Sequence, residues 1–131
     1  SMKHLPASTR RIIEDSVART RKNRVITLNF CLNYGGRQEL VDAVNAWAAS
    51  KKPGEKLTER SFGRHLYTAG LPDVDLLIRT SGEHRISNFL LWQIAYAEMI
   101  FTRVLWPDFG PRHLYRMIYE YQQRDRRFGG L

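Results

Sequence analysis

Segment 75–90 constrains this chain more than any other part, because it reads as a strand, a basic loop and a helix start in direct succession. Its apolar first part ends at Arg79, and a short polar loop that contains Arg85 follows. Ser87 and Asn88 then stand before a second apolar stretch, where they predict a helix start. Two guanidinium groups, a hydroxyl and free backbone N–H donors would meet at such a point. That combination suits a phosphate or a diphosphate.

Each part of this pattern also has a simpler interpretation. Arg79 could be a bidentate phosphate clamp, or a surface arginine that pairs with a nearby carboxylate such as Glu83. Ser87 and Asn88 could do no more than cap the helix that follows them, although a capping residue can also face a ligand. Arg85 favours the phosphate interpretation, because a hydroxyl follows it at a helix start, where the helix dipole already attracts anions.

The alternation of strand-like and helix-like segments predicts an α/β fold, with a partial parallel sheet of about three strands flanked by helices. The expected strands are 24–32, buried on both faces, 74–78 and 101–106. The expected helices are 8–22, with Ile12, Ile13 and Val17 turned inward, 40–48, 58–70, 88–99 and one with Pro111 in its first turn. Ligands bind such sheets at the carboxyl ends of the strands, where 33–37 and 79–85 both fall. Three strands are few for a parallel sheet, which suggests part of a larger domain.

The composition is that of one globular domain with a polyanionic partner. The 131 residues are 43% hydrophobic and carry a formal net charge of +8, which suits nucleic acid, anionic lipid or a phosphorylated small molecule. The one cysteine, Cys31, excludes a disulfide framework and fits a reducing compartment. No apolar run approaches the ~20 residues of a membrane span, and no secretory signal is visible. We expect Ser1 and Met2 to be the remnant of a tag, and the domain to occupy 3–131.

Glu98 and His84 are the candidate metal ligands. Glu98 stands in a stretch with few other charges, and Mg²⁺ is often held by one or two carboxylates together with substrate phosphates and water. The alternative is a glutamate at a helix end that pairs with Arg103 or with solvent. Roughly 15 Å of helical rise would separate it from Asn88, so either the helix is shorter or Glu98 serves a site across a subunit boundary. His84 has no second Cys or His at ligand spacing and is more simply a loop histidine.

Four stretches of the sequence resemble the cis-prenyltransferase family: TLNFCLNYGGRQELVDAV, VDLLIRTSGEHRISNFLLWQIAYAE, VLWPDF and RRFGG. The similarity runs from about Leu5 to the end of the chain. It implies a transferase that condenses isopentenyl diphosphate with an allylic diphosphate such as farnesyl diphosphate, with Mg²⁺, into a long cis-polyprenyl diphosphate such as undecaprenyl diphosphate. It also implies a homodimer in the cytoplasm, with peripheral contact to the inner face of the membrane that receives this lipid.

The resemblance assigns roles to individual residues. Four positions match those that hold isopentenyl diphosphate in the family: Arg79, Arg85, Ile86 and Ser87. Glu98 matches a Mg²⁺ ligand, and His84 lies in the loop that approaches this metal. Arg127 and Gly129 match a C-terminal Arg-x-Gly arm, which in the family reaches the active site of the neighbouring subunit.

The family's N-terminal half has no counterpart in these residues. That half carries an Asp-Gly-Asn-Gly-Arg-Trp phosphate loop with the essential metal-binding aspartate, the proposed catalytic asparagine, the allylic diphosphate site and much of the product tunnel. We therefore expect a C-terminal half that holds no catalytic residue and does not elongate prenyl chains alone. One alternative is the non-catalytic partner of a two-subunit enzyme, but its substrate loop would be degraded, whereas Arg79, Arg85 and Ser87 are intact. Another is a basic nucleic-acid-binding domain. No recognised motif supports it, and we expect no nucleic-acid partner.

Overall fold

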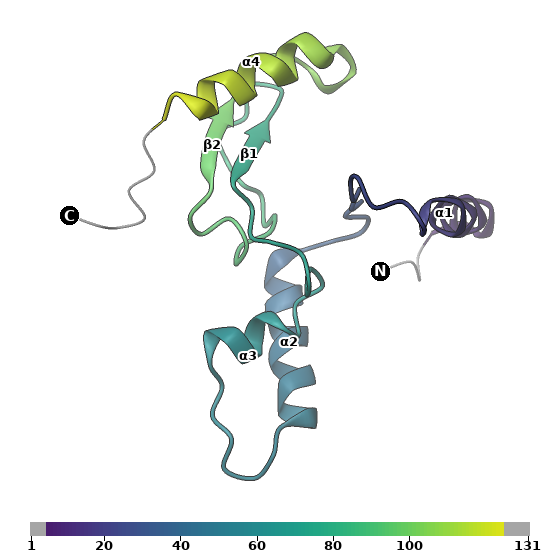
Figure 1. Ribbon diagram of the computed structural model, residues 1–131, viewed down its shortest axis with the longest axis vertical. Coiled ribbons are helices and arrows are strands. Elements are labelled where there is room, and N and C mark those ends of the chain that lie inside the picture. The colour runs from purple at the N-terminus through teal and green to yellow at the C-terminus, as the bar shows by residue number, and fades with distance from the viewer. Residues whose placement is uncertain (1–4, 125–131) are drawn as a thin grey trace. The chain divides into compact units, whose positions relative to one another are not determined.

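The computed structural model describes residues 5–124 (Figure 1). The chain divides between Tyr34 and Gly35 into two compact units, and each is described by itself. In the first unit the described residues form one helix, α1 (Ala7–Thr20). The second unit contains, in chain order, α2 (Gly36–Ser50), α3 (Glu59–Gly63), β1 (Leu76–Arg79), β2 (Glu98–Phe101), the 3-10 helix η2 (Trp106–Asp108) and α4 (Pro111–Gln122).

In the first unit, the helix predicted over 8–22 is confirmed, but the inward orientation predicted for Ile12 and Val17 is wrong, whereas Ile13 is half-buried. Ile12 and Val17 are 67% and 61% exposed, and α1 buries no residue. The strand predicted over 24–32 is also wrong: the run is irregular, and Val25 is 100% exposed. A strand forms only where a second strand completes its hydrogen bonds. The sheet found in the described residues joins β1 to β2 alone.

The second unit contains a two-stranded parallel sheet, which confirms the predicted α/β class and corrects the predicted number of strands. Arg79 is the last residue of β1 and Glu98 the first of β2, so the two lie at opposite ends of the sheet. The sequence predicts a strand over 101–106. The structure instead has β2 over Glu98–Phe101, which ends at the first residue of the predicted strand. Beyond β2, the carbonyls of Thr102 and Val104 accept N–H groups from the loop after β1 instead of regular ladder bonds.

The helix predicted over 88–99 is wrong, and turns occupy most of that stretch. Ser87, Asn88 and Leu90 all have left-handed backbones, with φ of 46°, 64° and 45°. A right-handed helix cannot pass through such residues, so the ladder of hydrogen bonds from residue i to residue i−4 is not continuous. Ser87 and Asn88 therefore do not open a helix of their own.

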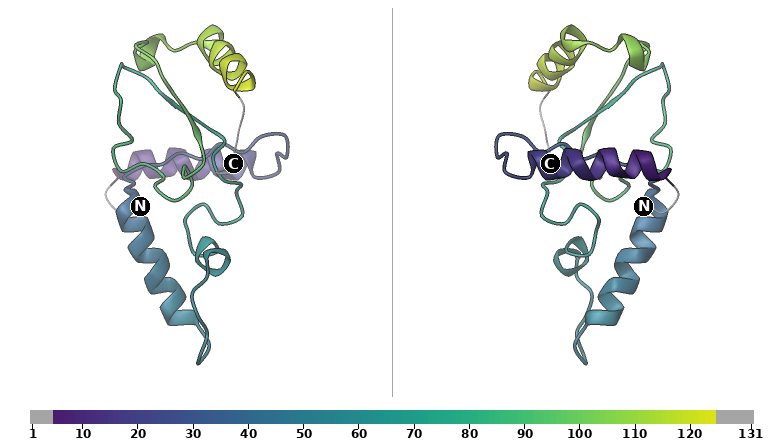
Figure 2. Two further views of the ribbon diagram at one scale, coloured as in Figure 1. Left: turned by 90° about the vertical axis from the view of Figure 1, so that its left-hand side faces the viewer. Right: turned by 90° about the vertical axis from the view of Figure 1, so that its right-hand side faces the viewer.

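α2 and α3 lie side by side and, with Leu66 just after α3, form a small hydrophobic cluster of the second unit (Figures 1 and 2). Ala43 of α2 packs with Phe62 and Leu66, and all three are buried. The helix predicted over 40–48 is confirmed and is longer than expected. α3 starts after Thr58 as predicted, with the Thr58 hydroxyl accepting a backbone N–H at 3.1 Å. The regular helix ends after five residues rather than continuing to the predicted end, and turns fill the remainder.

α4 begins at Pro111, as predicted, and the N–H of the preceding Gly110 donates to Nδ1 of His113 at 3.1 Å. Met117 is buried on one side of the helix, whereas Tyr115 and Tyr119 are exposed. The helix thus has one buried side and an exposed aromatic side.

A surface hydrogen bond from the Tyr67 hydroxyl to the Asp42 carboxylate couples stability to pH. This bond, followed by one from the Gln38 amide, lowers the pKa of Asp42, and the same Asp42 bond raises the pKa of Tyr67. A carboxylate with a lowered pKa contributes stability above its unfolded pKa of about 3.9, and loses that contribution as the pH falls through the folded pKa. The phenol contribution is present below its unfolded pKa of about 10 and is lost as the pH rises above it.

We therefore expect Tyr67→Phe to be less stable than the wild type near neutral pH, and the difference to shrink as the carboxylate is protonated. Urea titrations of both proteins at neutral pH and at about pH 2 measure this difference. A difference in unfolding free energy that persists undiminished in acid would contradict the assignment.

Candidate functional site

The loop after β1 begins as an extension of the sheet. The Arg79 carbonyl accepts the Thr102 N–H at 2.9 Å, and the Gly82 N–H donates to the Thr102 carbonyl at 2.8 Å. The Ser81 N–H donates to the Val104 carbonyl at 2.9 Å. The partly buried Arg79 side chain therefore projects from a backbone that hydrogen bonds hold in place.

Arg85 forms an ion pair with Glu83, the carboxylate that the sequence offered as a partner for Arg79. The Arg85 side chain is 64% exposed, so solvent screens the pair, and such surface pairs contribute about 0–1 kcal/mol. A diphosphate can therefore replace Glu83 at little cost and accept the same guanidinium donors. Ser87 follows in an exposed position and Ile86 is half-buried, so the structure keeps the predicted phosphate residues in one loop.

Asn88 caps α2 rather than a helix of its own. Its side-chain Oδ1 accepts the Arg37 N–H at 2.8 Å, and its backbone carbonyl accepts the Gly36 N–H at 2.7 Å. Two N-terminal donors of α2 are consequently already used. Segment 33–37, which the sequence placed at the ligand-binding edge, does not offer these two N–H groups to an anion.

Glu98 lies at the amino end of β2 instead of at a helix end, so the expected helical rise of roughly 15 Å does not separate it from Asn88. It is still three strand residues, or roughly 10 Å, from the end of the sheet where Arg79 lies. Its carboxylate accepts from Arg124 at 2.8 Å, not from the expected Arg103. Arg124 also donates to Glu120 at 2.7 Å and to the Met99 carbonyl at 3.1 Å. The hydrogen bond to Glu98 is the main cause that raises the pKa of Arg124.

A basic cavity of about 460 Å³ lies between α4 and the segment formed by β2 and the residues after it. His84 lines it and packs against Phe101, with ring centroids 4.9 Å apart. Four other side chains in the lining are charged: Arg103, Arg116, Glu120 and Arg124. Three arginines against one carboxylate favour an anion. Sequence reasoning missed Arg116 and Glu120, although their spacing of four residues places them on one face of α4.

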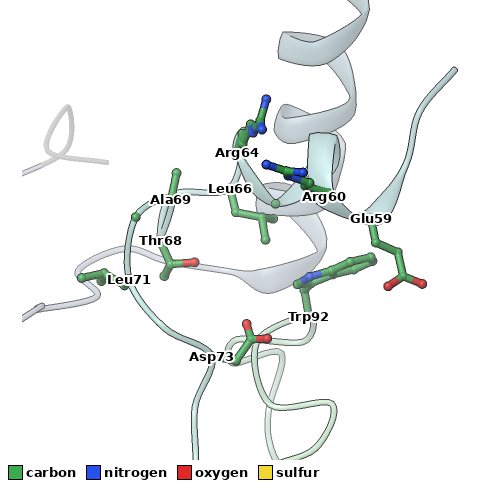
Figure 3. A pocket seen from close by; sticks show the side chains of 11 residues that line it. Glu59, Arg60, Arg64, Leu66, Thr68, Ala69, Leu71, Asp73 and Trp92 are labelled. Carbon is green, nitrogen blue, oxygen red and sulfur yellow. The ribbon is translucent and has the colours of Figure 1, made fainter. Parts of the chain in front are cut away.

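A second cavity, of about 490 Å³, lies beside α3 and is shown in Figure 3. Arg60, Arg64, Glu59 and Asp73 line it, together with the Trp92 ring. Its two positive and two negative groups cancel, so it is less suited to a diphosphate than the basic cavity.

The predicted metal and arm residues are only partly covered by the structure. Among residues 5–124, no three His, Cys, Asp or Glu side chains gather as a metal ion would require. Arg127 and Gly129, predicted for the C-terminal arm, lie outside the described residues. In the described part of the chain, no helix combines the length and apolar character that a bilayer crossing requires.

The family model described as "Putative undecaprenyl diphosphate synthase" matches residues 1–129. The chain belongs to this family. It is 52% identical over 131 residues to the isoprenyl transferase of Bacillus subtilis (strain 168), an alignment that covers 97% of this chain and 50% of the relative. The isoprenyl transferase of Geobacillus kaustophilus (strain HTA426) is also 52% identical over 131 residues, with 97% and 51% covered. The chain thus spans about half the length of these members of the undecaprenyl diphosphate synthase family.

Solved structures of similar proteins support the same fold. Lavandulyl diphosphate synthase from Lavandula x intermedia, in complex with dimethylallyl diphosphate, superimposes with a TM-score of 0.91 at 35% identity and covers 98% of this chain and 57% of that protein. A probable undecaprenyl diphosphate synthase from Campylobacter jejuni superimposes with a TM-score of 0.83 at 31% identity, and the match covers 98% of this chain and 60% of that protein. The short parallel sheet with its flanking helices is therefore part of the fold of this family.

Proposed function

We propose that this chain is the part of a cis-prenyl diphosphate synthase that holds isopentenyl diphosphate. The parent enzyme would condense it with an allylic diphosphate such as farnesyl diphosphate, and release a long cis-polyprenyl diphosphate such as undecaprenyl diphosphate. The observation that carries the proposal is the loop at the carboxyl end of β1, with Arg79, Arg85 and Ser87, in a chain that the family model matches almost throughout.

The charges in this loop fit the proposed substrate. Arg79 and Arg85 would neutralise a diphosphate that otherwise repels a second diphosphate nearby. The Ser87 hydroxyl would donate a further hydrogen bond, and Ile86 would contact the same ligand. Much of the catalytic effect would come from orienting the isopentenyl double bond against the allylic carbon.

Mg²⁺ fits the available donors only together with the substrate. Glu98 offers carboxylate oxygens and His84 one nitrogen, and Mg²⁺ commonly takes its other ligands from phosphate and water. Because Glu98 accepts from Arg124, we propose that Glu98 exchanges this partner when the ion binds. When bound, Mg²⁺ would offset the charge on a leaving diphosphate.

Calorimetric titration with isopentenyl diphosphate and Mg²⁺ tests the proposal. We expect Arg79→Ala to weaken binding at least about tenfold, or about 1.4 kcal/mol, because it removes one bidentate partner of the diphosphate. Arg60→Ala, which removes an arginine from the neutral cavity, is the matched control and should bind as the wild type does. Equal affinity in Arg79→Ala and the wild type would remove Arg79 from the site. Chelation of Mg²⁺ in a parallel titration should also weaken binding.

The homodimer and the cytoplasmic location at the inner face of the membrane stay predictions. The exposed aromatic side of α4, with Tyr115 and Tyr119, is the surface that we propose for contact with a second copy. Light scattering of the samples used for titration reports the mass, and a monomer at every concentration would contradict the dimer.

A further inference from the structure

We propose that Gly35, Gly36 and Asn88 act as positioning residues for the diphosphate loop. Together they join the start of α2 to the loop, at the residue that directly follows Ser87, and we call this junction the α2–loop lock. The inference rests on the proposed function, because it explains how the loop is held in a shape that can bind a diphosphate.

Two hydrogen bonds make the lock. The Asn88 carbonyl accepts the Gly36 N–H at 2.7 Å, and the Asn88 side chain accepts the Arg37 N–H at 2.8 Å. Both donors belong to the first turn of α2, whose N–H groups have no partner within the helix. One asparagine thus satisfies two of these donors, and its own position is fixed by a rigid helix.

The lock also explains why two adjacent residues are glycines: there is no room for a Cβ at either position, whereas neither needs the backbone freedom of glycine. A Cβ at Gly36 would lie 2.8 Å from the Leu91 Cγ and 3.1 Å from the Asn88 carbonyl oxygen. A Cβ at Gly35 would lie 2.9 Å from the Asn88 Nδ2. Neither glycine has a left-handed backbone, so close approach of the loop is the reason for a residue without a side chain.

The loop needs such support because its backbone is strained. Ser87, Asn88 and Leu90 all have φ between 45° and 64°. Non-glycine residues in this region persist only where their surroundings hold them. A second anchor lies further along the connection, where the buried Gln93 amide donates to Glu39 of α2 at 3.1 Å and 3.2 Å. Leu90 therefore lies between two anchors, Asn88 and Gln93, and Ser87 is the last residue before the lock.

If the lock positions the loop, disturbing it should weaken diphosphate binding although no lock residue is proposed to touch the ligand. Gly36→Ala should raise the dissociation constant for isopentenyl diphosphate at least tenfold in the presence of Mg²⁺. Gly63→Ala is the matched control, because a Cβ there meets nothing within 4 Å, and it should leave affinity unchanged. Circular dichroism and thermal unfolding of each variant check that it is folded.

Asn88→Gly provides a second variant that relieves the left-handed strain and deletes only the side-chain cap. It should fold and still bind isopentenyl diphosphate at least fivefold more weakly. Combining each lock variant with Ser87→Ala distinguishes a positioning role of the lock from a merely structural one. In the wild type, Ser87→Ala should weaken binding, whereas in Gly36→Ala it should add little, because the hydroxyl is already displaced.

The possible failures can be told apart. Wild-type affinity in folded Gly36→Ala and Asn88→Gly, with Arg79→Ala still impaired, would overturn the lock and leave the proposed function standing. A full additional effect of Ser87→Ala in Gly36→Ala would also overturn it. Undiminished affinity in Arg79→Ala would instead overturn the proposed function, and the lock inference with it.

Discussion

Replacing Glu39 with alanine is expected to lower the free energy of unfolding by about 2–4 kcal/mol. Glu39 is fully buried in α2, and its carboxylate accepts the Tyr67 N–H at 2.9 Å and the Gln93 amide at 3.1 Å and 3.2 Å. Alanine would leave these two donors without their carboxylate acceptor in a partly or fully buried place, and an unsatisfied buried donor costs about 1–3 kcal/mol. The Gln93 amide would keep its bond to Thr68 at 2.9 Å, which limits the loss.

Urea unfolding followed by circular dichroism measures this effect. Asn45→Ala is the control for helix propensity, because it makes the same change to alanine at an exposed position of α2. Glu39→Gln should be closer to the wild type than Glu39→Ala, since an amide oxygen can still accept from Tyr67 and Gln93 in nearly the same volume. If Glu39→Ala unfolds at the same urea concentration as Asn45→Ala, the Glu39 network does not stabilise the fold.

The helices of this chain were largely predictable because their signals are local. Spacing of apolar residues located α1 and α2, a threonine cap located the start of α3, and a proline located the start of α4. Burial was less predictable, since it depends on what packs against each face. Val17 and Val25 follow patterns typical of buried positions, yet both are exposed. An apolar pattern indicates which face of a segment can be buried. It does not indicate which other segment packs against that face.

The connection 80–97 shows the opposite case, in which a non-local contact overrides a local pattern. Its apolar spacing favours a helix, but Asn88 is held against the start of α2, more than 50 residues earlier in the sequence. Asn88 also has a left-handed backbone, which interrupts any helix at this point. No window of neighbouring residues contains that information. The same holds for Glu98, whose partner Arg124 lies in the turn after α4 rather than in the adjacent segment.

The candidate site was therefore predictable as a loop but not as a cavity. Arg79, Arg85 and Ser87 belong to one short stretch, so their common place at the end of β1 and in the loop after it follows from the sequence. Arg103 and Arg116 come to the basic cavity from β2's continuation and from α4, and only the fold brings them near His84. Charge alone indicated an anionic partner, whereas the fold shows that three arginines of the second unit line one cavity.

A polypeptide of these 131 residues, assayed alone, is expected to incorporate no detectable isopentenyl units, and this is the largest effect that we predict. The proposed reaction needs two diphosphates held in reacting geometry, and such positioning corresponds to effective concentrations of about 10⁵–10⁸ M. The loop described above accounts for one of the two. An allylic substrate that arrives from solution would lose that advantage, so the rate should fall below detection even where isopentenyl diphosphate is bound.

Incorporation of radiolabelled isopentenyl diphosphate with farnesyl diphosphate and Mg²⁺ measures this. The isoprenyl transferase of Bacillus subtilis, which is about twice as long, serves as the positive control under the same conditions. Turnover by the pure 131-residue chain would contradict the prediction and require both diphosphates to be held within these residues. The basic cavity would then be the place to look for the second one, because among the described residues Arg103 and Arg116 form no ion pair and could both receive it. Arg103→Ala and Arg116→Ala should in that event abolish turnover, while Arg60→Ala should not.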